Sequence, residues 1–265
     1  MRTTQTSDGP ISVVDRISAV LEAFNGSAPM TLAQVTARTK LPRSSVHRLL
    51  EQLASAGWLA RSPEQTYELG VKAYEMGQAA LNQNRLLRAA RPVMHAFAQR
   101  TGYTIQLGVV DAGDTVYLAK VNGRLSGPTP TAVGQRVPAH LTALGKVIIA
   151  YAEIAPRQSP RGLHKLDDGT LVKQTALSIT SPAQFDAELA QIRDRGAAFD
   201  RGEAFPGVAC VGVSIGPHDH IYGNLAGLSV CAPVGAVDLR KLMGPARIVA
   251  GEIWERCVTA DLTGH

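Results

Sequence analysis

Cysteine is scarce in this sequence, with only Cys210, Cys231 and Cys257 among 265 residues. The three are odd in number, lie far apart and form no CxxC pair. Neither a disulfide framework nor a zinc finger is therefore indicated, and buried free thiols are expected.

Long apolar runs are also missing. No stretch reaches the roughly 20 residues that cross a bilayer, and the amino-terminal MRTTQTSDGPISVVDR has no signal-peptide core. We therefore expect a cytoplasmic protein with no membrane partner. With 45% hydrophobic and 18% charged residues, the composition is that of a folded chain with one large domain or two modest ones.

Motifs for cofactors and metals are absent or weak. The sequence has neither GxGxxG nor GxxxxGK[ST], so no nucleotide cofactor is expected. His218-Asp219-His220 contains suitable metal ligands, but alternate residues of a tight turn point in different directions. No further ligand has a recognisable spacing to them, so an exposed loop tip is favoured and no metal is expected.

The net charge of +5 is unevenly distributed. Residues 1–100 hold 12 basic and 7 acidic side chains, whereas residues 101–265 hold 15 of each. A basic section joined to a neutral one is typical of a nucleic-acid-binding module attached to a sensing or catalytic module.

The first 70 residues predict three short helices followed by a two-stranded ribbon. Apolar residues recur at helical spacing from Val13 to Phe24, and Thr31 with Gln34 forms a capping box for the second helix. Pro42 opens a third helix, and two short strands are predicted at 58–61 and 66–70. This order of elements is that of a winged helix-turn-helix.

The third helix carries the predicted DNA-binding residues. Its apolar residues lie on one face, which leaves a polar face for the major groove. Arg48 is expected to pair with a guanine edge, and Arg43 with the helix N-terminus is expected to hold a phosphate. A solvated face on a small helical bundle is the alternative. The full predicted set is Arg43, Ser44, Ser45, His47 and Arg48 on this helix, with Arg61 on the ribbon.

The rest of the chain predicts a linker and a second domain. Helices at 71–83 and 86–100 form the linker, assigned to residues 71–101 between a DNA-binding domain at 1–70 and a domain at 102–265. The last part alternates paired strands at 104–110, 115–121, 208–215 and 223–231 with helices at 140–152, 182–196 and 238–258. We expect an α+β fold around an antiparallel sheet.

Four segments resemble the IclR family of bacterial transcriptional regulators. Residues 31–70 resemble its DNA-binding domain, VGQRVPAHLTALGKVIIA its pocket helix, IRDRGAAFDRGEAFPGVACVGVSI its third signature, and GLSVCAP the strand before its last helix. The resemblance implies a winged helix-turn-helix, a helical linker used in dimerisation, and a GAF-like carboxy-terminal domain that binds a small effector. It also implies a homodimer or a dimer of dimers on double-stranded operator DNA.

The resemblance also implies an effector pocket, position by position. Two departures lie near it: Asp200 is followed by Arg-Gly-Glu where relatives commonly have acidic residues, and Cys231 replaces a frequent serine. Strand alternation independently places Val208 with Cys210, and Ser229 with Cys231, although plain core residues are the alternative. The implied lining is Thr129, Val137, Ala143, Leu144, Asp200, Val208, Cys210, Ser229 and Cys231.

The pocket chemistry favours a small carboxylate as effector, hydroxylated or aromatic. Free amides near residues 141–143 are suited to an anionic group, and Asp200 to accepting a hydrogen bond from a ligand hydroxyl.

A serine hydrolase is the alternative from another class, because Gly212-Val213-Ser214-Ile215-Gly216 matches GxSxG. A nucleophile elbow needs a helix directly after the serine, whereas this segment leads into another predicted strand. Asp219 and His220 are too close in sequence to complete a triad. We therefore expect no enzyme and no catalytic residue.

Overall fold

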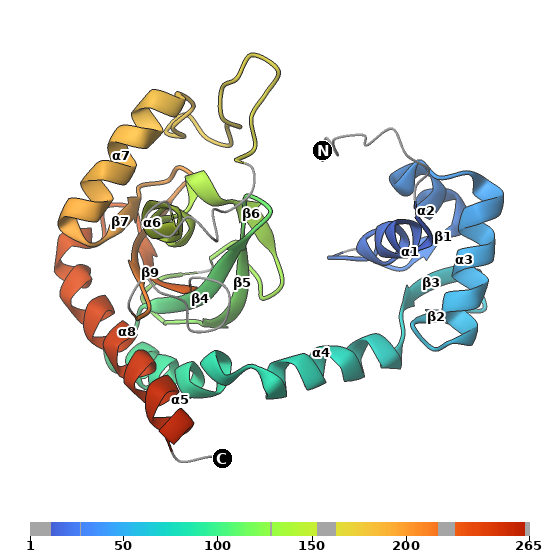
Figure 1. The fold of residues 1–265 in the computed structure, drawn as a ribbon, viewed down its shortest axis with the longest axis horizontal. Helices are drawn as coiled ribbons and strands as arrows, with labels where there is room; N and C mark the ends of the chain where they lie inside the picture. The colour runs from blue at the N-terminus through green and yellow to red at the C-terminus, as the bar shows by residue number, and fades with distance from the viewer. Residues whose placement is uncertain (1–11, 27, 128, 153–162, 217–225, 263–265) are drawn as a thin grey trace. The chain divides into compact units, whose positions relative to one another are not determined.

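The computed structural model describes residues 12–26, 28–127, 129–152, 163–216 and 226–262 (Figure 1). The chain forms two structural units, Met1–Gln83 and Asn84–His265. The predicted linker is divided between them, because its first helix belongs to the first unit and its second helix to the second unit.

The first unit is the predicted winged helix-turn-helix. Its elements are α1 (Val13–Glu22), β1 (Met30–Thr31), α2 (Leu32–Thr39), α3 (Arg43–Ser55), β2 (Leu59–Arg61), β3 (Thr66–Leu69) and α4 (Val71–Gln83). The strands form one antiparallel sheet in the order β1-β3-β2. The two-residue strand β1, which carries no alternation to detect, was not predicted.

Local signals explain the helix boundaries in this unit. Thr31 and Gln34 form the predicted capping box of α2. Lys40 ends α2 in the left-handed conformation at φ 56°, and Pro42 then occupies the N-cap of α3, one position earlier than predicted. The core that α1, α2 and α3 share is apolar and closed, with Val20, Val35 and Val46 fully buried.

The second unit contains a six-stranded antiparallel sheet in the order β6-β5-β4-β9-β8-β7. Its strands are β4 (Thr104–Asp111), β5 (Asp114–Val121), β6 (Arg136–Pro138), β7 (Ala198–Asp200), β8 (Val208–Ser214) and β9 (Ala226–Pro233). The helices are α5 (Arg85–Thr101), α6 (Ala143–Ala152), α7 (Pro182–Arg195) and α8 (Leu239–Leu262), with a 3-10 turn at Ala139–Leu141.

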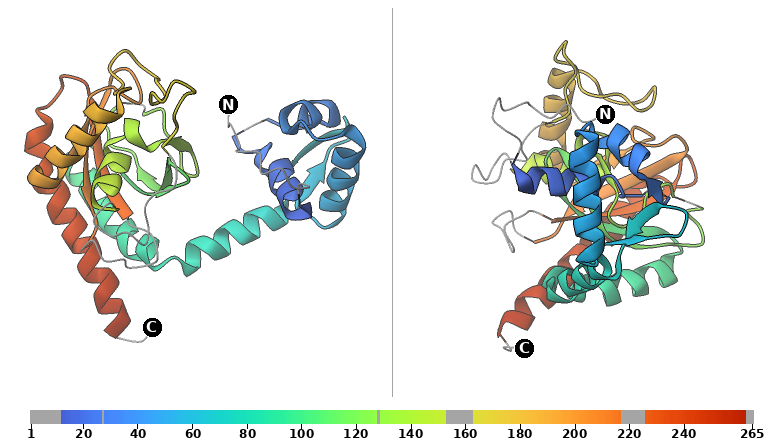
Figure 2. Two further views of the ribbon diagram at one scale, coloured as in Figure 1. Left: turned by 45° about the horizontal axis from the view of Figure 1, so that its top comes forward. Right: turned by 90° about the vertical axis from the view of Figure 1, so that its right-hand side faces the viewer.

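Helices cover both faces of this sheet. α6 packs on one face, with α7 against it, and α5 and α8 pack together on the other (Figures 1 and 2). The fold is thus the expected α+β class. The short strands β6 and β7 at the two sheet edges were not predicted, and the turn expected at 217–220 lies outside the described residues.

No helix in the described ranges is both long and apolar enough to cross a membrane.

Candidate functional site

The first candidate site is the N-terminal half of α3. Pro42 offers no side-chain cap, so the first-turn amides of α3 are not satisfied by a capping group. Arg43, Ser44, His47 and Arg48 are exposed around this helix end, and Ser45 is half-buried. Free amides together with guanidinium groups form a surface suited to phosphates and base edges.

Arg61 lies on β2, in the two-stranded ribbon of β2 and β3 that forms the wing, and its side chain bonds to α3. Its Nη1 donates to Glu51 Oε1 at 3.1 Å, and Tyr67 Oη donates to the same oxygen at 2.7 Å. The hydrogen bond from Tyr67 lowers the pKa of Glu51. The guanidinium also lies 5.7 Å from the centre of the Tyr67 ring. The carboxylate of Glu51 therefore links α3 to both strands of the wing.

The second candidate site lies on the α6 face of the C-terminal sheet. Asp200, Cys210, Cys231 and Thr104 are direct partners across four neighbouring strands. Partners in an antiparallel sheet share a face, so these side chains form one row. Cys210 Sγ lies 2.7 Å from Cys231 Sγ, and that contact together with burial raises the pKa of Cys210.

A second, more polar row lies two residues along the strands. Ser229 faces Gln106, and Gln106 faces Lys120. Gln106 Nε2 donates to Thr131 Oγ1 at 2.5 Å, and Lys120 Nζ donates to the carbonyl oxygens of residues 129 and 131 at 3.0 and 2.5 Å. The loop between β5 and β6 is thereby fixed over this row.

A register shift in the β4–β5 pair brings Tyr117 to the same face. Gln106 pairs with Lys120 and Gly108 with Tyr117, so β5 has one residue more than β4 between these pairs. The Tyr117 side chain is buried, and burial raises its pKa well above the ordinary value, with Cys210 and Cys231 among its neighbours.

The start of α6 packs closely against this surface. A Cβ at Gly212 would lie 2.3 Å from the carbonyl oxygen of Ala143, so only glycine permits this approach of β8 to the helix. Ala143 then contacts Cys210 and Cys231, with Val208 packed against the cluster. An apolar patch therefore adjoins the two polar rows.

Three buried charges lie beside the patch. Lys146 Nζ donates to both carboxylate oxygens of Glu203 at 2.7 and 2.8 Å, and both side chains are buried. Asp200 Oδ1 accepts from the backbone amides of residues 202 and 203 at 2.9 and 2.7 Å. Burial raises the pKa of Asp200 to about 6, against the opposing attraction of Lys146.

The structure brings most of the predicted effector residues together, but not all. Ala143, Asp200, Val208, Cys210, Ser229 and Cys231 share the surface just described. Val137 and Leu144 belong to the large apolar core around α6, and the half-buried Thr129 has a buried Oγ1 without a described partner.

Sequence reasoning missed Gln106, Lys120, Thr131, Lys146 and Glu203. Lys146 could have been found from the sequence, because it is the only charged residue in the apolar helix Ala143–Ala152. The other four depend on strand register and loop position, which no local pattern reveals.

Ser214 ends β8 as an extended residue paired with Gly227 of β9. Strand therefore pairs with strand here, without the strand–turn–helix geometry of a nucleophile elbow. His218, Asp219 and His220 lie outside the described residues. Among the residues that are described, no group of three or more His, Cys, Asp and Glu side chains could hold a metal ion.

The chain thus joins a winged helix-turn-helix to an α+β unit with a candidate ligand site. This combination defines the class of DNA-binding regulators that carry a sensing domain. Residues 13–63 match the IclR helix-turn-helix domain, and residues 78–249, more than half of the chain, match the bacterial transcriptional regulator IclR C-terminal domain. The chain belongs to the IclR family of bacterial transcriptional regulators. Such regulators are not enzymes, in agreement with the sequence-based expectation.

Curated relatives and solved structures agree with this assignment. The chain is 31% identical over 231 residues to the HTH-type transcriptional regulator XynR of Escherichia coli strain K12, covering 86% of this chain and 88% of that protein. It is 30% identical over 227 residues to BhcR of Paracoccus denitrificans, covering 85% and 78%.

The fold is that of solved family members. An IclR homologue from Microbacterium hydrocarbonoxydans complexed with 4-hydroxybenzoate superposes with a TM-score of 0.78 at 24% identity, covering 94% of this chain and all of the other. The Thermotoga maritima IclR gives 0.66 at 24% identity, covering 92% and 98%.

Proposed function

We propose that this regulator changes its affinity for operator DNA when a small organic carboxylate binds on the α6 face of the C-terminal sheet. The observation that carries the proposal is Lys120. Its ammonium is held by two loop carbonyls at the end of a polar row and forms no ion pair within the described part of the chain. An anionic ligand would supply the missing negative charge.

The rest of the surface defines the ligand further. Ala143, Cys210 and Cys231 offer an apolar wall, which suits a ring or a short carbon chain. Asp200 has one oxygen occupied by backbone amides, which leaves the other for a ligand hydroxyl. A hydroxylated or aromatic carboxylate satisfies these three features, and the bound 4-hydroxybenzoate of the Microbacterium homologue is such a molecule.

On the DNA side, Arg48 and His47 would contact base edges in the major groove. Arg43, Ser44 and Ser45 would hold a phosphate at the open N-terminus of α3. Arg61 would contact the DNA backbone from the wing, in the position that Glu51 gives it. These assignments rest on exposure and on the uncapped helix end.

A homodimer, or a dimer of such dimers, would carry these sites to a pseudo-palindromic operator in the bacterial cytoplasm. Helix α4 supports this proposal because it buries none of its residues in the single chain. Val71, Tyr74 and Met76 are 72%, 69% and 54% exposed. Val71 and Tyr74 are three residues apart and so lie on one side of the helix, where exposed apolar neighbours favour a protein-contact surface.

The experiment starts from operator fragments selected from random DNA by the purified protein. Arg48→Ala is expected to cost about 1–3 kcal/mol of operator affinity and to relax sequence preference, whereas Arg43→Ala weakens all sequences alike and lowers the salt slope by about one. Arg256→Ala, an exposed arginine of the second unit, is the matched control. Unchanged operator binding by Arg48→Ala at fixed salt would remove the recognition-helix assignment.

Effector response is tested with 4-hydroxybenzoate and related organic acids. A saturating effector is expected to change operator affinity by about 5- to 150-fold, the usual range of coupling between sites. Asp200→Asn and Lys120→Gln should retain operator affinity without effector and need a higher effector concentration to respond. If both variants respond at the parent concentration, the proposed effector surface is wrong.

A further inference from the structure

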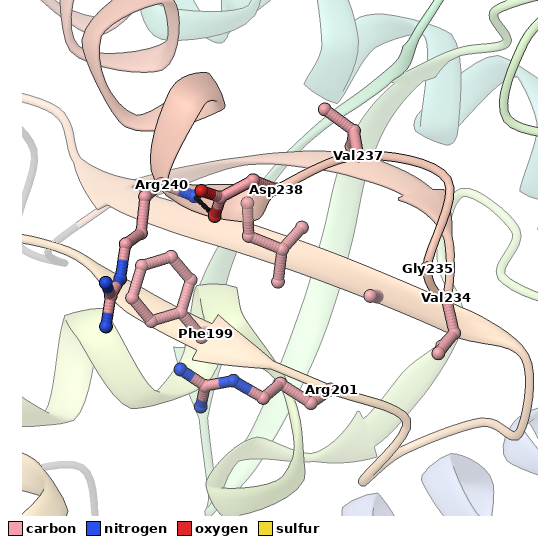
Figure 3. A pocket seen from close by; sticks show the side chains of 9 residues that line it. Phe199, Arg201, Val234, Gly235, Val237, Asp238 and Arg240 are labelled. Atoms are coloured by element: carbon pink, nitrogen blue, oxygen red, sulfur yellow. Dashed lines mark hydrogen bonds between the residues drawn. The ribbon is translucent and has the colours of Figure 1, made fainter.

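A pocket lies on the face of the C-terminal sheet opposite the candidate effector surface, where β7, β8 and the start of α8 meet (Figure 3). It has a volume of about 330 Å³. Phe199 and Arg201 line it and flank Asp200 in sequence, so strand alternation directs them away from the candidate effector surface. Ala209, which precedes Cys210, lines it for the same reason.

Two guanidinium groups line this pocket without an ion pair to any of the described residues. In the described ranges, neither Arg201 nor Arg240 forms a hydrogen bond or an ion pair through its side chain with a protein group. Asp238 lies close by, but its Oδ1 accepts from the backbone amide of Arg240 at 3.0 Å and so caps the first turn of α8. The pocket lining therefore carries two positive side chains against one carboxylate, a net charge of +1.

Phe199 explains how one of these groups is positioned. Arg195 and Arg201 each place the guanidinium carbon 4.8 Å from the centre of its ring. Arg195 is neutralised by Glu188, whose Oε1 lies 2.5 Å from Nη2. With the residues that the structure describes, Arg201 makes only the ring contact, and stacking leaves the N–H groups in the guanidinium plane free to donate.

The geometry is that of an anion site with an apolar side. Arg201, which follows β7, and Arg240, at the start of α8, both end beside the Phe199 ring (Figure 3). A carboxylate between them would receive charge-assisted hydrogen bonds from a planar donor group. Val234 and Val237 on the loop before α8 line the rest of the pocket and would contact a carbon skeleton.

We propose that this pocket is a second ligand site, separate from the candidate effector surface, which binds a small organic anion through Arg201 and Arg240. A volume of about 330 Å³ falls at the lower end of small-molecule sites, which suits a monocarboxylate with a short apolar body. The two sites share β7 and β8 but use opposite faces of these strands.

The test uses a reporter at the pocket itself. Val234 is 53% exposed at the rim, whereas the three native cysteines are buried, so a Val234→Cys variant of the full chain can be labelled selectively with a fluorinated thiol reagent. Benzoate is expected to shift the fluorine resonance saturably. Benzamide, which has a similar shape and no charge, should leave it unchanged.

Substitutions in the labelled background decide the role of the arginines. Arg201→Gln with Arg240→Gln should weaken benzoate binding by about tenfold or more, because charged hydrogen bonds are lost. Lys241→Gln, an exposed neighbour in the same turn of α8 outside the pocket lining, removes the same charge and should bind as the parent does. Arg240→Gln alone gives a smaller loss, and thermal unfolding verifies the fold of each variant.

Three results would overturn the proposal: no resonance shift at the highest soluble benzoate concentration, an equal response to benzamide, or equal binding by the double variant. Because the reporter senses only this pocket, failure here leaves the operator and effector tests of the proposed function unaffected.

Discussion

Replacing Asp200 by asparagine should make the C-terminal unit more stable at neutral pH. The side chain is 4% exposed, and burial raises the pKa of its carboxyl group to about 6 from 3.8. Asparagine has nearly the same shape, and its Oδ1 can accept the same two backbone hydrogen bonds. The substitution therefore removes a buried charge with little change in packing.

The sign and size follow from proton linkage. A carboxyl group with a raised pKa binds its proton more tightly in the folded protein, so stability falls as pH rises from about 3.8 to about 6. A pKa difference of about 2 corresponds to about 3 kcal/mol, fully present only well above pH 6. About half of this cost develops between about pH 5 and about pH 8.

Urea unfolding at several pH values measures this effect. A Trp58→Phe background leaves Trp254 as the only tryptophan, so that its fluorescence reports on the second unit alone. The stability gained by Asp200→Asn should grow by roughly 1 kcal/mol from about pH 5 to about pH 8. Asp167→Asn, at an exposed loop position, is the control and should show no such trend. A pH-independent difference, or a variant less stable than its parent at about pH 8, would refute the reasoning.

Three further changes test other parts of the molecule. Lys146→Met should cost about 3–5 kcal/mol in the same unfolding assay, because Glu203 is left buried without its partner, and adding Glu203→Leu should recover most of the loss; an additive loss would contradict this. Tyr67→Phe should raise the pKa of Glu51, measured by NMR titration, and an unchanged value would mean that the hydrogen bond is absent in solution. Ser214→Ala should leave operator binding and effector response intact, and serine-dependent turnover of a model ester would argue against this.

Sequence patterns predicted those parts of the fold that local chemistry determines. The capping box of Thr31 and Gln34, the apolar face of α3 and the long strands β4, β5, β8 and β9 all lie close to their predicted positions. The strands β1, β6 and β7 have two or three residues each and depend on their neighbours, so no periodicity marks them.

In the candidate site, too, local patterns predicted some residues, whereas others depend on how the strands pair. Alternation placed Val208 with Cys210 along β8 and Ser229 with Cys231 along β9, but the contact of the two cysteines requires the strand register. Tyr117 joins the face of Gln106 and Lys120 because of a register shift in the β4–β5 pair, and no sequence pattern predicts that shift. Glu203 joins the site through a turn after β7 that pairs it with Lys146.

The attachments of α6 determine which part of the second unit can respond to a ligand. Lys146 fixes the helix to Glu203 after β7, and Gly212 brings β8 against its first turn, so α6, β7 and β8 are expected to move as one body. Gln106 and Lys120 lie on β4 and β5, the strands on whose other face α5 packs. Displacement of these two strands would reach α5, the helix that directly follows α4 in the chain. Under the proposed function, the signal from ligand to DNA would thus pass through α5, which packs on the face of the sheet opposite α6.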